Sequence, residues 1–303
     1  MKEPHKDVGA SVRARLLQLA KRRGDDFQLL LMRYANERLL YRLTKSQHAG
    51  LFLLKGAALF TLWTGHAHRA TRDMDLLGFG EPSVERLRSI FTEVVALDVD
   101  DDGVVFDASS LKVEPIREDQ LYGGIRLVMI ARITNARVRL QVDVGFGDAV
   151  TPEAQVVEFP PLLHFPGPQL RAYPKETVVA EKLEALVQLG LANTRMKDFY
   201  DLAALSNLFE FEGQLLVDAI SATFARRGTR LPADTPTAFR AEFTGDATKN
   251  VQWTAFVKKA GITGAADLKA TMDLVELFVG QALRAAGAAQ DFGARWSPPG
   301  PWM

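Results

Sequence analysis

The sequence contains no cysteine and only five histidines among its 303 residues. The absence of cysteine excludes a disulfide framework and every thiolate-ligated metal site. With so few imidazoles, the pair His66 and His68 does not predict a zinc site. Long hydrophobic runs are also missing, because no stretch reaches the ~18 apolar residues of a membrane span. Charges interrupt every short apolar run of residues 1–23, so we expect no secretory signal and a soluble, cytoplasmic protein.

The chain has no net charge, since 37 basic residues balance 37 acidic ones. It therefore has no global field that would favour nucleic acid over other partners. The distribution is uneven, because residues 1–45 hold eleven lysines and arginines against five acids. This local excess of six could attract a phosphate backbone. The alternative is an ordinary solvated helix surface.

Helical and strand patterns alternate in the first half of the chain. Helical spacing of apolar residues occurs at 12–23, 27–46, 56–63 and 81–95. Strand-like stretches occur at 51–54, 68–80, 111–116, 124–134 and 137–148. The break at Asn135–Ala136 between two runs rich in β-branched residues predicts an antiparallel hairpin.

The second half is helical nearly to its end. Residues 150–173 contain five prolines and no sustained period, which indicates a linker with short extended pieces. From residue 174 onward the apolar spacing is helical, and the tail WSPPGPWM (296–303) is expected to be loosely held. We predict an α+β fold, with residues 1–170 forming the first domain and residues 171–303 a helical carboxy-terminal domain.

The stretch HRATRDMDLLGFG, residues 68–80, carries two aspartates one residue apart. In a strand, Thr71, Asp73 and Asp75 would share one face, while Met74 and Leu76 pack behind. Two same-face carboxylates can converge on one Mg²⁺, which prefers oxygen ligands. A plain exposed strand face is the alternative.

Two further features favour a metal and phosphate site. LLKGA (53–57) places Gly56 at the expected start of a helix, where backbone N–H groups can bind a phosphate. Asp143 lies in the hydrophobic strand VRLQVDVGF, where an unpaired carboxylate would be costly. Asp143 is therefore a candidate third acid, or the partner of a salt bridge to Arg139 or to a neighbouring strand.

Motifs for other chemistries fail. DVDDDG (98–103) begins like a calcium loop but has Ser109, not glutamate, at the twelfth position. The chain has no GxxxxGK[ST] phosphate loop and no serine-elbow motif. These absences disfavour a P-loop ATPase and a serine hydrolase.

LLKGAALFTLW (53–63) followed by HRATRDMDLL (68–77) resembles the glycine-helix-DxD signature of polymerase-β-like nucleotidyltransferases. More specifically, it resembles the AbiEii/AbiGii toxin family. YPKETVVAEKLEALVQLGLANTRMKDFYDL (173–202) is similar to that family's lysine-bearing helix and its downstream [RK]-D-x-x-D-L motif. The resemblance covers residues 50–205 and implies a polymerase-β-like nucleotidyltransferase core, a mixed sheet flanked by helices.

The resemblance implies roles for individual residues near the first motif. Asp73 and Asp75, with Asp143 as third carboxylate, would hold Mg²⁺, or Mn²⁺ in its place. Gly56 would let the backbone approach the triphosphate, and the nucleotide would also contact Arg69 and Thr71. Ala57 stands where the family usually has a second glycine or a serine, so a serine hydroxyl contact is absent.

The second motif carries a lysine and its partners. Lys182 would neutralise the nucleotide phosphates, and Asp198 would orient Lys182 or the substrate. Secondary candidates are Arg195, Lys197 and Asp201. Ordinary helix surface is the alternative for Lys182, and capping of the helix start is the alternative for Asp198.

The resemblance implies magnesium-dependent transfer of a nucleoside monophosphate from an NTP to an acceptor, with release of pyrophosphate. The expected acceptor is RNA, in particular the 3′ end of tRNA. The expected context is the toxin half of a type IV toxin–antitoxin pair, with an antitoxin as partner. Transfer onto a protein side chain is one alternative. A non-catalytic nucleotide- or RNA-binding module is the other, which a complete acid set disfavours.

Overall fold

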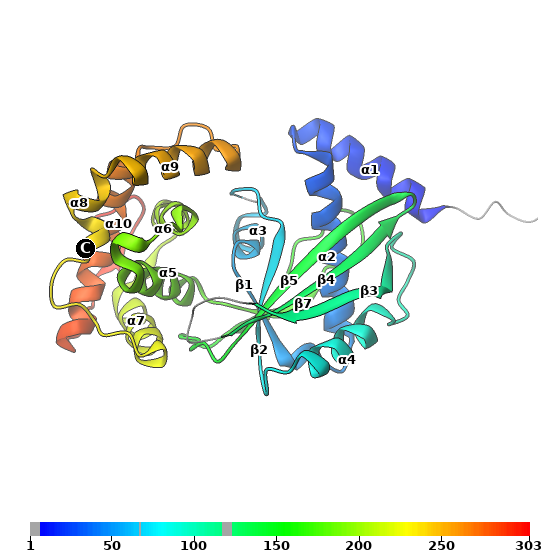
Figure 1. The fold of residues 1–303 in the computed structure, drawn as a ribbon, viewed down its shortest axis with the longest axis horizontal. Helices are drawn as coiled ribbons and strands as arrows, with labels where there is room; N and C mark the ends of the chain where they lie inside the picture. The colour runs from blue at the N-terminus through cyan, green and yellow to red at the C-terminus, as the bar shows by residue number, and fades with distance from the viewer. Residues whose placement is uncertain (1–6, 67, 117–122) are drawn as a thin grey trace, which may run out of the picture. The chain divides into compact units, whose positions relative to one another are not determined.

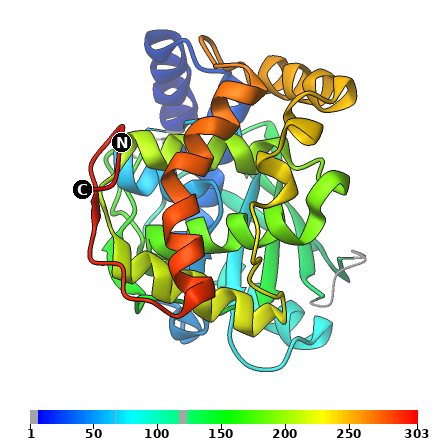
Figure 2. The same cartoon turned by 90° about the vertical axis from the view of Figure 1, so that its left-hand side faces the viewer.

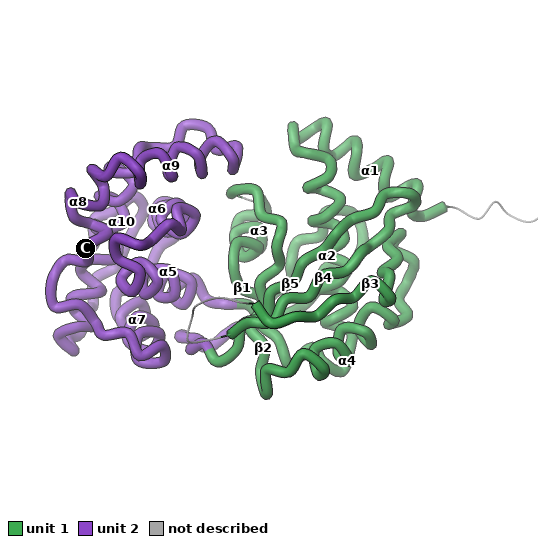
Figure 3. The backbone as a smooth tube through the Cα atoms, viewed as in Figure 1, with its two compact units in different colours: residues 1–147, 155–172 green, residues 148–154, 173–303 purple. Residues whose placement is uncertain are grey.

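The computed structural model describes residues 7–66, 68–116 and 123–303, which divide between two units (Figure 3). Unit 1 comprises residues 1–147 and 155–172, and unit 2 comprises residues 148–154 and 173–303. The main division therefore falls after residue 172. In addition, a short segment that follows the last long strand of unit 1 belongs to unit 2.

Unit 1 is built on a seven-stranded mixed sheet in the order β3-β4-β5-β2-β1-β7-β6 (Figure 1). The strands are β1 Phe52–Lys55, β2 Asp73–Gly78, β3 Val105–Pro115, β4 Ile125–Ile133, β5 Ala136–Phe146, β6 Gln155–Glu158 and β7 Gln169–Ala172. β2 is parallel to β5 and antiparallel to β1. β4 and β5 form the predicted hairpin, which turns at Thr134 and Asn135 because Ile133 pairs with Ala136.

Four helices of unit 1 accompany the sheet in the described part of the chain. They are α1 Val8–Arg23, α2 Phe27–Lys45, α3 Ala58–Thr64 and α4 Val84–Val95, with a 3-10 turn at Ala49–Leu51. Gly24 ends α1 in the left-handed region, and the Asp26 side chain caps α2 by accepting from the Leu29 amide. α2 contacts β5, and α4 contacts β3. The side chains that α2 and β5 bury, such as Leu39 and Val142, form part of the core.

The proline-rich segment 150–173 is more than the predicted linker. Its two extended pieces join the sheet: β7 lies parallel to β1, with Leu54 opposite Ala172, and β6 is antiparallel to β7. Extended backbone needs partners for its N–H and C=O groups, and the sheet edge supplies them. The expectation of a linker was therefore wrong for residues 155–172, although the extended pieces were predicted.

Unit 2 is mainly helical, as the apolar spacing predicts. Its helices are α5 Lys175–Leu189, α6 Met196–Leu208, α7 Gly213–Arg227, α8 Ala241–Thr244, α9 Ala247–Ala260 and α10 Leu268–Ala288. Short elements complete it, namely 3-10 turns at Gly190–Ala192 and Thr237–Phe239 and the strand pair β8 Phe211–Glu212 and β9 Arg295–Trp296. α5 packs on α6 and α7, and the long α10 (orange in Figure 2) packs on the same two helices. The sheet of unit 1 and the helices of unit 2 make the fold α+β, as predicted.

The carboxy-terminal tail is firmly packed, so the prediction of a loose tail was wrong. Trp296 is fully buried, and its indole Nε1 donates to the Ser206 carbonyl at 2.7 Å. Trp302 is also buried and donates to the Phe278 carbonyl at 2.7 Å. Two indoles that bury their rings and satisfy their N–H groups outweigh the irregular backbone between them.

No helix in the part of the chain that the structure describes combines the length and the apolar character needed to cross a bilayer.

Candidate functional site

Four charged residues occupy one register row across the sheet of unit 1. Lys55 of β1 lies opposite Asp75 of β2, and Asp75 lies beside Asp143 of β5. Asp143 in turn lies opposite Arg126 of β4. Paired residues on neighbouring strands project from the same face of a sheet. The row, Lys55-Asp75-Asp143-Arg126, therefore places two carboxylates between two cations.

Asp73 extends this row by one strand period. It lies two residues before Asp75, on the same face, and beside Gln141 of β5. Asp73 is exposed, whereas Asp75 is half-buried. The prediction that Thr71 shares this strand was wrong, because β2 begins at Asp73, where its pairing with β5 begins. The Thr71 hydroxyl instead lies 3.4 Å from the carbonyl of Asp73, to which it donates.

Gly56 lies in the turn between β1 and α3, against the carboxylate of Asp75. Its φ of +74° lies in the left-handed region that favours glycine. A Cβ on Gly56 would overlap the Asp75 carboxylate. The structure therefore gives a second physical reason for glycine here, besides the predicted approach of a triphosphate: Asp75 can hold its position only because residue 56 has no side chain.

Asp143 is engaged by an arginine, as one of the two interpretations of the sequence allowed. Its Oδ1 accepts from Arg126 Nε at 2.8 Å and its Oδ2 from Arg126 Nη2 at 2.7 Å. Gln141 Nε2 lies 3.3 Å from both oxygens. The partner is on the neighbouring strand β4 and is not Arg139. Within the described residues, no three metal-ligating side chains are gathered closely enough to hold a metal ion.

A hollow in unit 1 borders Asp73. Arg69 and Thr71, which precede β2, line it together with Asp73 itself. Arg33 and Asn36 of α2 form another part of its wall, and apolar side chains form the rest. The structure therefore brings Arg69, Thr71 and Asp73, predicted from one motif, to a single concave surface.

Lys182 occupies a buried ion cluster in unit 2. Its Nζ donates to Asp198 Oδ1 at 2.7 Å and to Asp201 Oδ2 at 2.8 Å. Asp198 Oδ2 also accepts from Arg195 Nε at 2.6 Å. The side chain of Lys182 is 14% exposed, which rules out ordinary helix surface. Asp198 does not cap α6 with its side chain, so the alternative of a capping role is wrong.

Burial and charge act in opposite directions on the pKa values of this cluster. Burial alone would lower the pKa of Lys182, but the attraction of Asp198 and Asp201 outweighs it, and the pKa is raised. Burial alone would raise the pKa of Asp198, but Lys182 and Arg195 outweigh it, and the pKa is lowered. Lys182 and Asp198 are therefore both charged at neutral pH. Asp201, ranked only as secondary from the sequence, is a direct partner of the lysine, whereas Lys197 is exposed.

A second ion cluster holds the helix of Lys182 in place, and no pattern in the sequence indicates it. Arg227, at the end of α7, donates to Glu184 Oε2 at 2.7 Å and to Asp148 Oδ1 at 3.1 Å. Its Nη2 also lies 3.5 Å from Glu181 Oε1. The Tyr173 hydroxyl lies 3.2 Å from the same Glu181 atom, and burial raises the pKa of this tyrosine well above its usual value. The partners Glu184 and Asp148 are 43 and 79 residues from Arg227, so no local motif could have predicted them.

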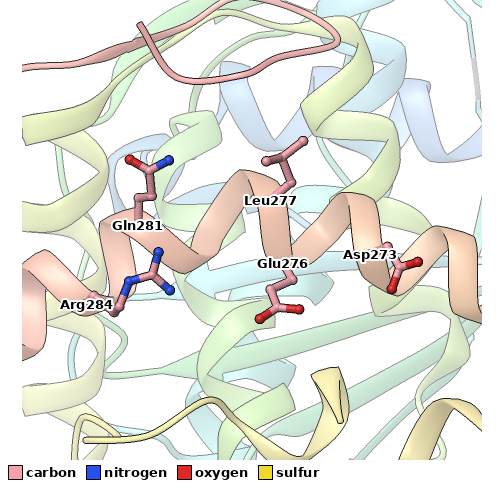
Figure 4. Close-up of a pocket in the computed structure, with 5 residues that line it drawn as sticks. All are labelled: Asp273, Glu276, Leu277, Gln281 and Arg284. Carbon is pink, nitrogen blue, oxygen red and sulfur yellow. The ribbon is translucent and has the colours of Figure 1, made fainter. Parts of the chain in front are cut away.

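A second hollow lies along α10 (Figure 4). Its lining consists of Asp273, Glu276, Leu277, Gln281 and Arg284. Asp273 is already paired with Lys269 at 2.6 Å. None of the residues singled out from the sequence lines this hollow, and it contributes nothing to the site.

A sequence model described as "Nucleotidyl transferase AbiEii toxin, Type IV TA system" matches residues 38–274. The match spans the sheet with its carboxylate row and the helices that carry the buried lysine, and it makes the protein a nucleotidyltransferase. The chain belongs to the AbiEii nucleotidyltransferase toxin family of type IV toxin–antitoxin systems. The family resemblance read from the glycine, DxD and lysine motifs is thereby confirmed.

Two solved structures from Helicobacter pylori share the fold. The protein JHP933 is 16% identical with a TM-score of 0.50, and the match covers 87% of this chain and 94% of that one. A protein provisionally named a nucleotidyltransferase is 15% identical with a TM-score of 0.51, and the match covers 88% and 100%. At such identities the likeness bears on the fold alone. No curated protein matches the chain.

Proposed function

We propose that this nucleotidyltransferase uses Mg²⁺ held by Asp73 and Asp75 to transfer a nucleoside monophosphate from an NTP to the 3′ end of an RNA, tRNA in particular. The observation that carries the proposal is the placement of the two aspartates on one face of β2, with Asp75 held against Gly56.

The donor set fits magnesium. Mg²⁺ in phosphoryl-transfer sites is bound by one or two carboxylates plus substrate phosphates, and it keeps several waters. Two same-face residues of a strand have Cα atoms about 6.6 Å apart, so Asp73 and Asp75 can reach one cation. Neighbouring carboxylates repel one another until a cation binds. When bound, Mg²⁺, or Mn²⁺ in its place, would neutralise charge on the triphosphate.

The remaining residues of the site provide positive charge and position. Arg69 and Thr71, beside Asp73 in the hollow, contact the nucleotide phosphates, and Gly56 lets the backbone approach them. Lys182 supplies a further positive charge to the phosphates, and Asp198 orients its ammonium group. The acceptor hydroxyl oxygen attacks the α-phosphorus, the bond to pyrophosphate breaks, and the hydroxyl proton passes to water. Catalysis of this kind consists of positioning and charge stabilisation.

The surface of unit 1 supports an RNA acceptor in part. Lys21, Arg22 and Arg23 are exposed at the end of α1. Arg38 and Arg42 are buried and paired with Glu37 and Asp102, so they do not contribute to a binding surface. Of the other basic residues counted near the amino terminus, Lys2 and Lys6 lie outside the described residues. An RNA would therefore meet the end of α1, and family membership suggests an antitoxin as a second partner.

The direct test is to incubate the purified protein with Mg²⁺ and each NTP, radiolabelled on the α-phosphate, together with total RNA or cell lysate. We expect one or more of the NTPs to label RNA of tRNA size. Label that enters protein would replace the RNA acceptor by a protein side chain. Absence of label with every NTP and acceptor would contradict the transferase proposal and favour a binding module.

The carboxylate pair can be tested in the same assay. We expect Asp73→Ala and Asp75→Asn each to lower transfer by about 100-fold or more, as loss of a charge-stabilising group in a transition state does. Their melting temperatures should stay near that of the wild type, because removal of one carboxylate relieves repulsion with its neighbour. Asp107→Asn, in the ion pair of β3 with Arg132, is the matched control and should remain active. Near-normal activity of either site variant would refute the metal assignment.

A further inference from the structure

The ion pair between Asp143 and Arg126 points to a division of labour within the carboxylate row. Resting on the proposed function, we propose that Asp143 is a positioning residue that holds Arg126, and that Arg126 is a further binding residue for the nucleotide phosphates. Asp143 then is not the third metal ligand, and Asp73 and Asp75 alone supply the carboxylates.

Both oxygens of Asp143 already have strong partners. The two hydrogen bonds from Arg126, at 2.8 and 2.7 Å, have the parallel geometry of a bidentate arginine–carboxylate pair. Gln141, from the same strand, approaches both oxygens as well. A metal ion at Asp143 would have to displace the guanidinium, which cannot lose its proton and would be left beside a divalent cation.

Arg126 lies where a substrate phosphate can be met. It shares the register row with Asp75 and Asp143, at the end of the row opposite Lys55. Its side chain is 35% exposed, whereas that of Asp143 is 19% exposed, so the arginine is the more accessible member of the pair. Exposed Glu114 of β3 is the neighbour of Arg126 on its other side.

The chemistry of the pair fits this assignment. The ion pair with Asp143 uses the Nε and Nη2 edge of the guanidinium and thereby fixes the plane of the group. A planar guanidinium whose orientation is fixed matches the oxygens of a phosphate better than a flexible ammonium does. Arg126 and Lys55 thus place positive charge on both sides of the two carboxylates, as a triphosphate bound to a metal requires.

The test is a double-mutant cycle with Arg126→Ala, Asp143→Asn and the double variant. Arg132→Ala is the matched control, because Arg132 also lies on β4 and pairs with a carboxylate, Asp107. Three quantities are measured: the KM for the NTP, kcat, and the affinities for Mn²⁺ and for a non-hydrolysable NTP analogue without turnover. Thermal melting checks that each variant is folded, and Arg126→Lys provides a second, milder variant.

We expect each single variant to raise the NTP KM and weaken analogue binding by about tenfold, as loss of a charge-assisted hydrogen bond does. The double variant should be no worse than Arg126→Ala, because the two residues act as one unit. Mn²⁺ affinity should be unchanged in Asp143→Asn, and Arg126→Lys should restore binding in part.

Two results would overturn the proposal. Weaker Mn²⁺ binding in Asp143→Asn, or a loss of kcat in the double variant beyond that of Arg126→Ala, would make Asp143 a metal ligand. Unchanged KM and analogue binding in Arg126→Ala would make the pair purely structural. If the wild type transfers no nucleotide but the variants change analogue binding as expected, the proposed reaction fails while the role of the pair stands.

Discussion

At Gly56, the backbone and a carboxylate meet at the same point in space. We expect Gly56→Ala to abolish most nucleotide transfer, because the new Cβ displaces the Asp75 carboxylate. The positive φ adds a stability cost of about 1–2 kcal/mol. Gly50→Ala is the control: nothing lies within 4 Å of its Cβ position, so its effect on stability should stay within about 0.5 kcal/mol. Transfer rates and urea unfolding measure the two effects, and a fully active Gly56→Ala would show that Asp75 need not keep its position.

Lys182 is also a single residue on which a buried cluster depends. Lys182→Met should destabilise unit 2 by about 3–5 kcal/mol, because it leaves two buried carboxylates without their shared cation. Lys182→Arg, which keeps the charge but not the compact geometry, should recover part of both stability and activity. Chemical unfolding at neutral pH and the NTP KM are the measurements. A Met variant with wild-type stability and KM would remove both roles.

The same variant should change the pH dependence of unfolding. The lowered pKa of Asp198 contributes stability above its unfolded value of ~3.9, and that stability is lost as pH falls through the folded pKa. The raised pKa of Lys182 contributes stability fully below its unfolded value of ~10.4, and that stability is lost as pH rises through the folded pKa. The wild type should therefore hold the advantage between these limits and lose it in stronger acid or base.

The residues that could be predicted from the sequence are those that share a local motif. Asp73, Asp75 and Gly56 stand within 20 positions of each other, and Lys182 and Asp198 stand 16 apart. Their chemistry can be inferred from spacing and residue type. Arg126 and Arg227 could not be found in this way, because their partners are fixed by strand register and helix packing, which the spacing of charges along the chain does not encode.

At the scale of elements, the long periodic helices and the hairpin could be predicted, whereas the short, proline-rich and terminal segments could not. β6 and β7 have four residues each, too few for a period to stand out. Their place is set by an unpaired sheet edge, which is a property of the rest of unit 1. Likewise, the tail has no period at all, and its order comes from two tryptophans that find partners on α6 and α10.

The tail offers a test at this scale. Trp296→Ala should destabilise the protein by about 3–5 kcal/mol, as the loss of a large buried ring does. The ring also packs against Gly300, where a Cβ would meet it. Met303→Ala, at an exposed position of the same tail, should be neutral. Equal stability of the two variants in urea would show that the tail does not contribute to the fold.

At the scale of the whole molecule, a zero net charge conceals one exposed basic surface at the end of α1. Reversal of Lys21, Arg22 and Arg23 to glutamate should weaken RNA binding similarly for all sequences, because interactions with the RNA backbone position without specifying. The slope of log Kd against log salt should fall by about 0.9 for each phosphate that the variant no longer neutralises. NTP binding should be unchanged.

Reversal of the exposed Lys258 and Lys259 at the end of α9 is the control, and it should leave RNA affinity largely intact. Filter binding over a range of salt concentrations is the measurement. An RNA affinity indifferent to salt and to the α1 reversal would shift weight to a protein acceptor.

The path of the chain between the units limits how this protein can be divided. The chain leaves unit 1 after residue 147, returns at residue 155, and leaves again after residue 172. A fragment that begins at residue 173 would lack Asp148, a partner of Arg227, and Thr151, which exchanges hydrogen bonds with Thr177. No single cut yields two complete halves, so neither half can be exchanged between related toxins as a module by one crossover in the gene.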